Sequence, residues 1–398
     1  MKAAVVGGGL SGLAAALDLV DAGHQVTLYE ARPTLGGAVQ TLPERDGDPS
    51  PPPDNGQHIA LGCFTGYLGF LDRIGSLALT ERRRLALPVI DEQGRVATVG
   101  YGLLPLLRYR HIPLSDRLRI ARFLAGIGRL RPPQGTFGDL VRSKGHSQAA
   151  VDRFWDVFIR PALNMRSDEV DAARTVETIK IALRSGRSAS DLVLPRAPLG
   201  EIHGEAARRA LEAAGAEVRT NARVEALDEL GHDLVVLAVP PEESARLLGE
   251  PGPEYEYSPI VSVHLLFDRR LLRHELVALL GSDAHWVFDR GALTGHEPGS
   301  GGQYLTVVSS GAPELMELRG RELVELMRSQ LTERLGEAEL LWSRVSREPR
   351  ATIALRPGVE RPGSATGRDR VVRAGAWLEG LPPTMENAVL VGRQAVAA

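Results

Sequence analysis

Several features are scarce in this sequence of 398 residues, and each scarcity excludes a class of protein. The only cysteine is Cys63, so neither a disulfide framework nor a cysteine-based zinc site can form within the chain. Basic and acidic residues nearly balance at a net charge of −3, which gives no overall indication of nucleic acid binding. No stretch reaches the roughly 18 uninterrupted apolar residues that a membrane-spanning helix needs.

We expect that the first residues are not a signal peptide, because their apolar run is interrupted by glycines at Gly7 and continues with a helical period. A hydrophobic content of 43% and a charged content of 24% are ordinary for a soluble enzyme. We therefore expect a cytoplasmic protein, whose membrane contact is limited to peripheral association with the inner face of the cell membrane.

The first thirty residues have the pattern of a strand, a helix and a second strand. Ala3 to Val6 is an apolar run that stops at glycine, Leu10 to Val20 has helical spacing and ends near Gly23, and Gln25 to Tyr29 alternates. Such a βαβ unit favours a parallel sheet.

Further elements are predicted along the whole chain. We expect a loop over 43–56, a hairpin over 85–100 with its turn at 91–94, mostly helix over 114–195, a helix over 205–214, strands over 217–227, 233–240, 259–267 and 303–309, a helix over 319–335, and a final strand and helix over 371–375 and 384–396.

This order predicts an α/β fold in which a Rossmann-like domain is interleaved with a substrate domain of mixed or antiparallel sheet plus helices. Residues 1–75, 198–250 and 365–398 would form the first, and residues 76–197 (with a helical insertion) and 251–364 the second.

A dinucleotide-binding motif lies between the first strand and the helix. Gly7, Gly9 and Gly12 fit G-x-G-x-x-G, with Leu10 and Ser11 between the last two glycines. The glycines allow a tight turn and close approach to a pyrophosphate, and the helix amino terminus offers unpaired N–H groups to it. Glu30, at the end of the second strand, can accept the ribose hydroxyls.

The segment after Glu30 distinguishes FAD from NAD. It continues through Ala31 and Arg32 to a second glycine pair, Gly36-Gly37. This run resembles the flavin amine oxidase and phytoene desaturase superfamily, in which the second pair approaches the FAD pyrophosphate. The resemblance implies FAD as the cofactor.

Four later stretches narrow the resemblance. They are the run Asp54-Asn55-Gly56-Gln57-His58, Trp155 with the run 161–164, the run Ser190 to Arg196, and the run Leu381 to Val389. Together they are similar to the hydroxysqualene dehydroxylases, also called squalene-associated FAD-dependent desaturases, over nearly the whole chain.

The resemblance implies further FAD contacts and also shows two departures. The implied contacts are Asn55, Gly56, Val224, Gly375, Ala376, Thr384 and Met385, and the helix that starts at Thr384 would direct its dipole toward the flavin pyrimidine. Ala38 stands where the superfamily has Arg, and Ala376 where it has Asp. Losing one such contact typically costs ~1.5–3 kcal/mol, so the two departures together would weaken FAD binding by roughly one to four decades.

The implied reaction is the reductive dehydroxylation of hydroxysqualene to squalene, a step of hopanoid biosynthesis, with a long apolar isoprenoid as substrate. Candidate catalytic residues are His58, Asp54 and Gln57. His58 titrates in a useful range, and burial could raise the pKa of Asp54. Alternatively, Asp54 and Asn55 only shape the turn, and His58 is a structural residue.

Three other functions stay open at this point. The same fold serves carotenoid desaturases of the phytoene type, in which oxidised flavin accepts a hydride. A flavin amine oxidase would need an aromatic cage, for which Trp377 is a candidate member although aromatics are only 5%. Ala38 and Ala376 allow a degenerate flavin-fold protein that binds without catalysis.

Residues 114–130 could contact a membrane. Leu114, Leu118, Ala121, Leu124, Ala125 and Gly128 share one helical stripe, with Arg119, Arg122 and Arg129 to one side. A basic amphipathic helix can lie on an anionic membrane surface. The alternative is a packed domain helix with a solvated basic face.

Overall fold

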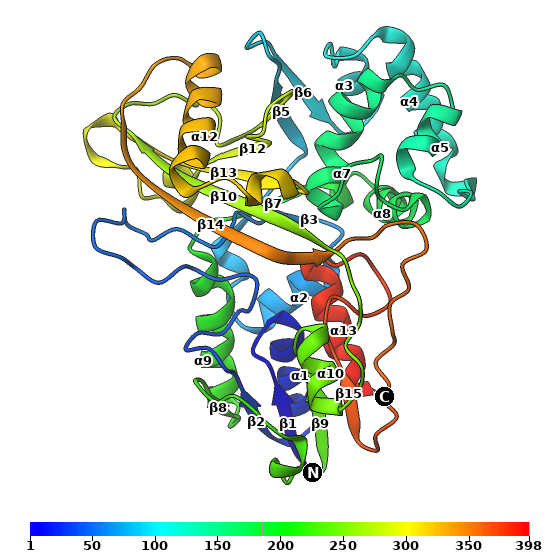
Figure 1. The fold of residues 1–398 in the computed structure, drawn as a ribbon, viewed down its shortest axis with the longest axis vertical. Coiled ribbons are helices and arrows are strands. Elements are labelled where there is room, and N and C mark those ends of the chain that lie inside the picture. Colours follow the sequence, from blue (N-terminus) through cyan, green and yellow to red (C-terminus); the bar gives the residue numbers. More distant parts are fainter. Residues whose placement is uncertain (185, 398) are drawn as a thin grey trace.

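The computed structural model describes residues 1–184 and 186–397, and three β-sheets organise them (Figure 1). A five-stranded sheet with its helices forms the lower part of Figure 1. A seven-stranded sheet crosses the upper part, and a group of helices lies beside it. This arrangement confirms the predicted α/β fold, whereas the domain boundaries given above stay a prediction.

The five-stranded sheet is parallel throughout, in the order β15-β9-β1-β2-β8. Its strands come from three distant segments of the chain: β1 (Lys2–Val6), β2 (Gln25–Tyr29), β8 (Glu217–Arg219), β9 (Leu234–Leu237) and β15 (Val371–Arg373). Helices α1 (Leu10–Asp21) and α13 (Met385–Ala397) pack against each other so closely that a Cβ on Gly392 would overlap the main chain of Ser11.

The seven-stranded sheet is antiparallel except where β11 meets β5. Its order is β14 (Leu340–Ile353), β10 (Tyr257–Phe267), β13 (Gln303–Ser310), β12 (Trp286–Asp289), β11 (Leu276–Leu279), β5 (Ala86–Ile90) and β6 (Val96–Gly100). Helix α12 (Gly320–Leu335) buries Leu323, Met327 and Leu331 against one face of it.

A small antiparallel sheet in the order β3-β7-β4 pairs segments from before and after the helical insertion. Its strands are β3 (Ala60–Leu61), β7 (Leu192–Pro195) and β4 (Thr80–Arg83). The remaining helices are α2 (Thr65–Arg73), α3 (Leu103–Arg108), α4 (Leu114–Gly126), α5 (Phe137–Ser143), α6 (Gln148–Ala150), α7 (Asp156–Leu163), α8 (Ala172–Arg184), α9 (Ala206–Ala213), α10 (Pro241–Leu248) and α11 (Arg290–Thr294).

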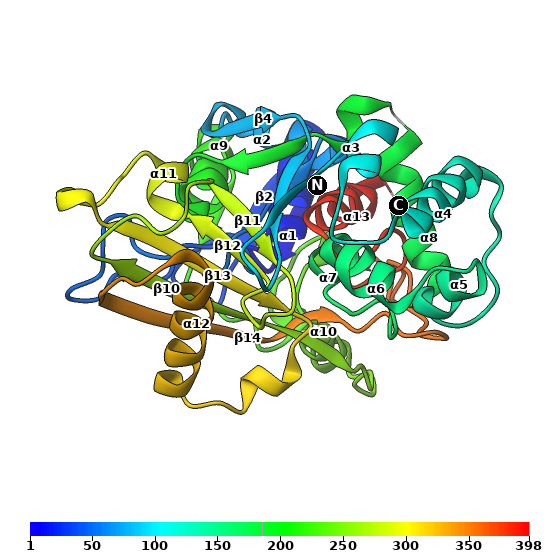
Figure 2. The same cartoon turned by 90° about the horizontal axis from the view of Figure 1, so that it is seen from above.

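The largest apolar cluster lies between the seven-stranded sheet and the inserted helices (Figure 2). It includes Trp286 and Val308 of the sheet and Phe123 and Trp155 of the insertion. Within the described residues, no helix combines the length and apolar character needed to cross a bilayer.

The structure corrects some of the predicted elements. Residues 192–195 form strand β7 instead of continuing the predicted helical segment, because they pair with both β3 and β4. The predicted strand over 217–227 ends at Arg219, so Val224 lies outside any strand. The longest strand, β14, was not predicted at all.

Candidate functional site

The turn after β1 is built from glycines that no other residue can replace. Gly7 has φ +106°, and a Cβ there would overlap the carbonyl oxygen of Ala238 on the neighbouring strand segment. A Cβ on Gly12 would overlap the carbonyl oxygen of Gly7. Helix α1 begins at Leu10 after Gly9, and no side chain caps it. Its free N–H groups therefore form an anion site at the end of the sheet.

Glu30 is held in place by main-chain donors. Its carboxylate accepts hydrogen bonds from the N–H of Gly8 at 2.7 Å and the N–H of Arg32 at 2.8 Å. Each carboxylate oxygen keeps a further lone pair for a ribose hydroxyl. Ala31 and Arg32 follow on the exposed surface.

The second glycine pair belongs to the same cradle as the first. The N–H of Gly36 donates to the carbonyl of Gly8 at 2.8 Å, and Gly9 and Gly36 form a parallel bridge. A Cβ on Gly37, whose φ is +61°, would lie 2.9 Å from the Cα of Gly9. The two glycine motifs thus form one floor, which fits a pyrophosphate.

Asn55 ties the Ala38 segment to the turn that follows the long loop. Its side-chain amide donates to the carbonyl of Ala38 at 2.7 Å and its N–H donates to the carbonyl of Gln40 at 3.0 Å. Ala38 itself is exposed and offers no charge. Gly56 is buried beside Ser262 of β10, so this turn packs against the seven-stranded sheet.

Asp54 is engaged on both oxygens. Its Oδ1 accepts from the hydroxyl of Thr41 at 2.7 Å and the N–H of Leu199 at 3.0 Å, and its Oδ2 pairs with Arg290. Asp54 and Arg290 are each 1% exposed. Burial raises the pKa of Asp54, while Arg290 and the hydrogen bonds oppose the rise.

Among the three candidate catalytic residues, Asp54 is bonded, whereas the side chains of His58 and Gln57 make no hydrogen bond to other described residues. Both are half-buried. Burial lowers the pKa of His58 to about 4, so its imidazole is neutral near pH 7. The following residues, Ile59 and Leu61, pack against the largest apolar cluster. The ring therefore stands where the polar turn meets an apolar wall.

The carboxyl-terminal segment is held by its own hydrogen bonds. The hydroxyl of Thr384 accepts the N–H of Asn387 at 3.3 Å and so caps α13, which begins at Met385. Asn387 in turn donates to the carbonyl of Ala376 at 3.0 Å. Gly375 lies under the indole of Trp377, and a Cβ there would overlap that ring.

Trp377 and Val224 each make a contact within the protein, and their predicted roles at the flavin stay predictions. The indole N–H of Trp377 donates to the carbonyl of Val239 at 3.0 Å, which directs the ring toward β9. Val224 packs in the apolar cluster beside β1 and β9, and its carbonyl accepts from Arg246 at 3.0 Å.

Residues that the sequence alone did not indicate hold this site together. Arg290, at the start of α11, donates to both Asp54 and the carbonyl of Pro52. Arg344 of β14 pairs with Asp48 of the same loop at 2.5 Å, and both side chains are at most 6% exposed. Only the burial of these charged side chains identifies Arg290 and Arg344 as residues of the site, and burial cannot be read from a single sequence.

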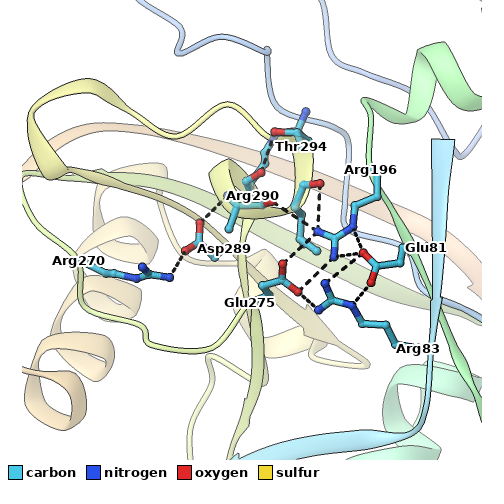
Figure 3. A network of polar contacts seen from close by, with 10 residues as sticks. Glu81, Arg83, Arg196, Arg270, Glu275, Asp289, Arg290 and Thr294 are labelled. Atoms are coloured by element: carbon cyan, nitrogen blue, oxygen red, sulfur yellow. Dashed lines mark hydrogen bonds and ion pairs between the residues drawn. The ribbon is translucent and has the colours of Figure 1, made fainter.

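The run Ser190 to Arg196 has a structural role that Figure 3 makes visible. Arg196 donates to Glu81 of β4 at 2.7 Å and to Glu275 at 3.1 Å, and Arg83 pairs with the same two carboxylates. The guanidinium of Arg196 also reaches carbonyls of α11. The network fixes the helix that carries Arg290, and through it the turn at Asp54.

Comparisons with known proteins agree with this geometry. A family model described as flavin containing amine oxidoreductase matches residues 10–398. A hydroxysqualene dehydroxylase of Sinorhizobium fredii is 28% identical over 98% of this chain and 96% of its own length. A probable zeta-carotene desaturase of Synechococcus elongatus is 24% identical over 100% and 98%. An oxidoreductase from Methanosarcina mazei has a TM-score of 0.78 at 19% identity, covering both chains completely.

Proposed function

The chain belongs to the family of flavin containing amine oxidoreductases and is an FAD-dependent oxidoreductase; on that premise we propose that it converts hydroxysqualene to squalene by reductive dehydroxylation. The observation that carries the proposal is the position of His58, an unpartnered neutral imidazole at the junction of the polar turn and the largest apolar cluster. A long hydrocarbon with one hydroxyl group needs this combination. The relative named hydroxysqualene dehydroxylase, matched over almost its full length, supports the same substrate.

The reaction breaks a C–O bond and forms a C–H bond, with water as the leaving product. Reduced FAD, when bound, supplies the hydride. The glycine cradle and the α1 amino terminus would hold its pyrophosphate, Glu30 its ribose, and the α13 amino terminus its pyrimidine edge. The apolar wall excludes water from the carbon that loses oxygen.

The leaving oxygen must gain a proton, and we assign this role to His58. Gln57 would orient the hydroxyl group through its amide. Asp54, engaged by Arg290, Thr41 and the Leu199 N–H, would hold the turn in position without donating a proton.

This assignment has a measurable consequence for the pH dependence. With a pKa of about 4, only a small fraction of His58 is protonated at pH 7, and that fraction grows tenfold for each unit by which the pH falls. We expect kcat/KM to rise about tenfold per unit between pH 8 and pH 6. His58→Gln should abolish this slope, and an unchanged slope in that variant would remove His58 as the acid.

The direct experiment is anaerobic incubation of the FAD-loaded, chemically reduced protein with hydroxysqualene. We expect squalene by mass spectrometry, one molecule per reduced flavin in a single turnover. Conversion of other polyenes without any squalene would contradict the substrate and leave the FAD assignment intact.

A carotenoid desaturase is the second candidate, favoured by the zeta-carotene desaturase relative and by the neutral state of His58, which suits proton removal. Oxidised protein would then consume a carotene only when an electron acceptor is supplied. This requirement separates it from the dehydroxylase, which needs reduced FAD. In either case we propose an apolar isoprenoid substrate and peripheral membrane contact through residues 114–130.

A further inference from the structure

Helix α4 has two apolar stripes, and only one of them faces the protein. Ile120, Phe123 and Ile127 (in the turn that follows the helix) are buried in the largest apolar cluster. Leu114 and Leu118, on the other side, are 57% and 54% exposed. The exposed leucines are therefore not needed for packing. A helix with one buried apolar side normally has polar residues on its water-facing side, and here that side carries leucines.

Helix α3 adds to the same feature. It packs against α4, and both lie at the outer edge of the molecule (Figures 1 and 2). Leu103 and Leu104 at its start are 58% and 57% exposed. These four leucines make up most of the large hydrophobic side chains that are exposed in the described chain. We call the exposed side of the two helices the α3–α4 face.

The charge around the α3–α4 face is strongly one-sided. Residues 96–135 contain seven arginines and a single acidic residue, Asp116, although the whole chain has a net charge of −3. Asp116 is 1% exposed and bonded to Ser147 and Arg119. Among the residues that the structure describes, five exposed arginines of this segment form no ion pair: Arg108, Arg110, Arg122, Arg129 and Arg131.

We propose that the α3–α4 face docks the protein onto an anionic lipid bilayer. A bilayer surface has an apolar acyl region and, above it, a region of charged phosphate groups. Exposed leucines can enter the acyl region while the neighbouring unpaired arginines bind the phosphate groups. A protein partner would require a shaped, partly apolar interface, whereas this face combines isolated leucines with a broad positive field. This proposal deepens the proposed function, because the reason for membrane docking rests on an apolar substrate.

The inner side of the same helices gives the docking a purpose. Ile120 and Phe123 belong to the apolar cluster that also contains Leu192, and Ile59 beside His58 packs against that cluster. One continuous apolar body thus extends from the α3–α4 face to the candidate catalytic turn.

Flotation of the FAD-loaded protein with vesicles tests the docking directly. We expect flotation with phosphatidylcholine vesicles that contain phosphatidylglycerol, decreasing as salt is added, and none with phosphatidylcholine alone. Leu114→Ser with Leu118→Ser should lower the partition coefficient roughly ten- to a hundredfold. Arg122→Glu with Arg129→Glu should lower it at least about tenfold.

Matched controls lie elsewhere on the surface. Leu341→Ser removes a leucine that is 55% exposed on β14, and Arg321→Glu reverses an exposed arginine on α12. Both should leave flotation unchanged, and the yellow colour of every variant reports that it is folded. Equal losses in the controls and the face variants would overturn the proposal.

Three further outcomes are decisive. If nothing floats and Leu114→Ser with Leu118→Ser turns a dimer into a monomer, the face is a subunit interface and the proposal falls. If the protein floats as expected but hydroxysqualene is not converted, the proposed function falls and the docking stands. If squalene forms from detergent-dispersed substrate while the protein never floats, the docking falls and the proposed function stands.

Discussion

The cofactor cradle and the catalytic turn are held by different means. In the cradle, main-chain atoms of the Gly7–Gly12 and Gly36–Gly37 segments contact each other within the first forty residues. At the turn, buried side-chain pairs such as Asp54–Arg290 and Asp48–Arg344 join positions more than 230 residues apart. A site made by the backbone leaves glycines at fixed spacing in the sequence, whereas a site made by distant ion pairs leaves no local trace.

The largest expected effect comes from a substitution in the glycine cradle, which is held by main-chain contacts. Gly12→Val places a side chain against the carbonyl of Gly7, so the cradle cannot form and FAD binding should be lost entirely. The flavin absorbance of the purified protein measures this. Gly69→Ala in α2, where a Cβ meets no neighbour, should remain yellow, and a yellow Gly12→Val protein would show that the cradle does not hold FAD.

Removing the buried ion pair between Asp54 and Arg290 should lower the stability of the folded protein. Arg290→Met leaves the carboxylate of Asp54 buried without its cation, which typically lowers the free energy of unfolding by ~3–5 kcal/mol. Urea unfolding measures the change. Asp54→Asn combined with Arg290→Met should recover more than half of it.

The exposed pair Arg73–Asp21 provides the control for that experiment. Its side chains are 40% and 49% exposed, so Asp21→Asn should change the free energy of unfolding by less than about 1 kcal/mol. Equal costs at the two pairs would mean that burial does not distinguish them.

Acid should weaken the folded state more gradually. Burial lowers the pKa of His58 to about 4 and those of His203 and His264 to about 3. The unfolded chain therefore binds more protons below pH 6.5, and each histidine contributes stability that is lost as the pH falls toward its folded pKa. The slope is at most about 1.4 kcal/mol per pH unit for each group.

Unfolding in urea at pH 7, 6 and 5 checks this dependence. His264→Gln should reduce the slope by at most about 1.4 kcal/mol per pH unit, since it removes one of five histidines whose pKa burial lowers: His58, His146, His203, His264 and His285. The exposed His274→Gln should leave the slope as it is. A slope that His264→Gln does not change would show that other groups cause the acid sensitivity.

The last prediction concerns FAD affinity at the cradle. Ala38→Arg adds a charged donor on the exposed position after Gly37 and should tighten FAD binding roughly ten- to a hundredfold. Titration of the FAD-free protein measures the dissociation constant. Ala213→Arg, on the remote helix α9, adds the same charge and should not change it.

Sequence alone predicted the parts of the fold that depend on local patterns and missed the parts that depend on distant contacts. The βαβ unit was predicted to within a residue or two, because its apolar runs and glycines are local. Strand β14 was missed, because it carries Arg344, Arg347 and Pro349 and has no clear alternation. Its order comes from pairing with β10, a contact that depends on the whole fold. The candidate site divides likewise, since Gly7 to Glu30 and the Asp54–His58 run were predicted and Arg290 was not.

The contact between α1 and α13 also bears on the order of events during synthesis. The first helix is buried against the last one, and β1 lies beside β9, which pairs with β15. A ribosome has therefore made almost the entire protein before the opening segment finds its final neighbours. We therefore expect FAD to bind late, after the carboxyl-terminal helix has been synthesised and has packed against α1.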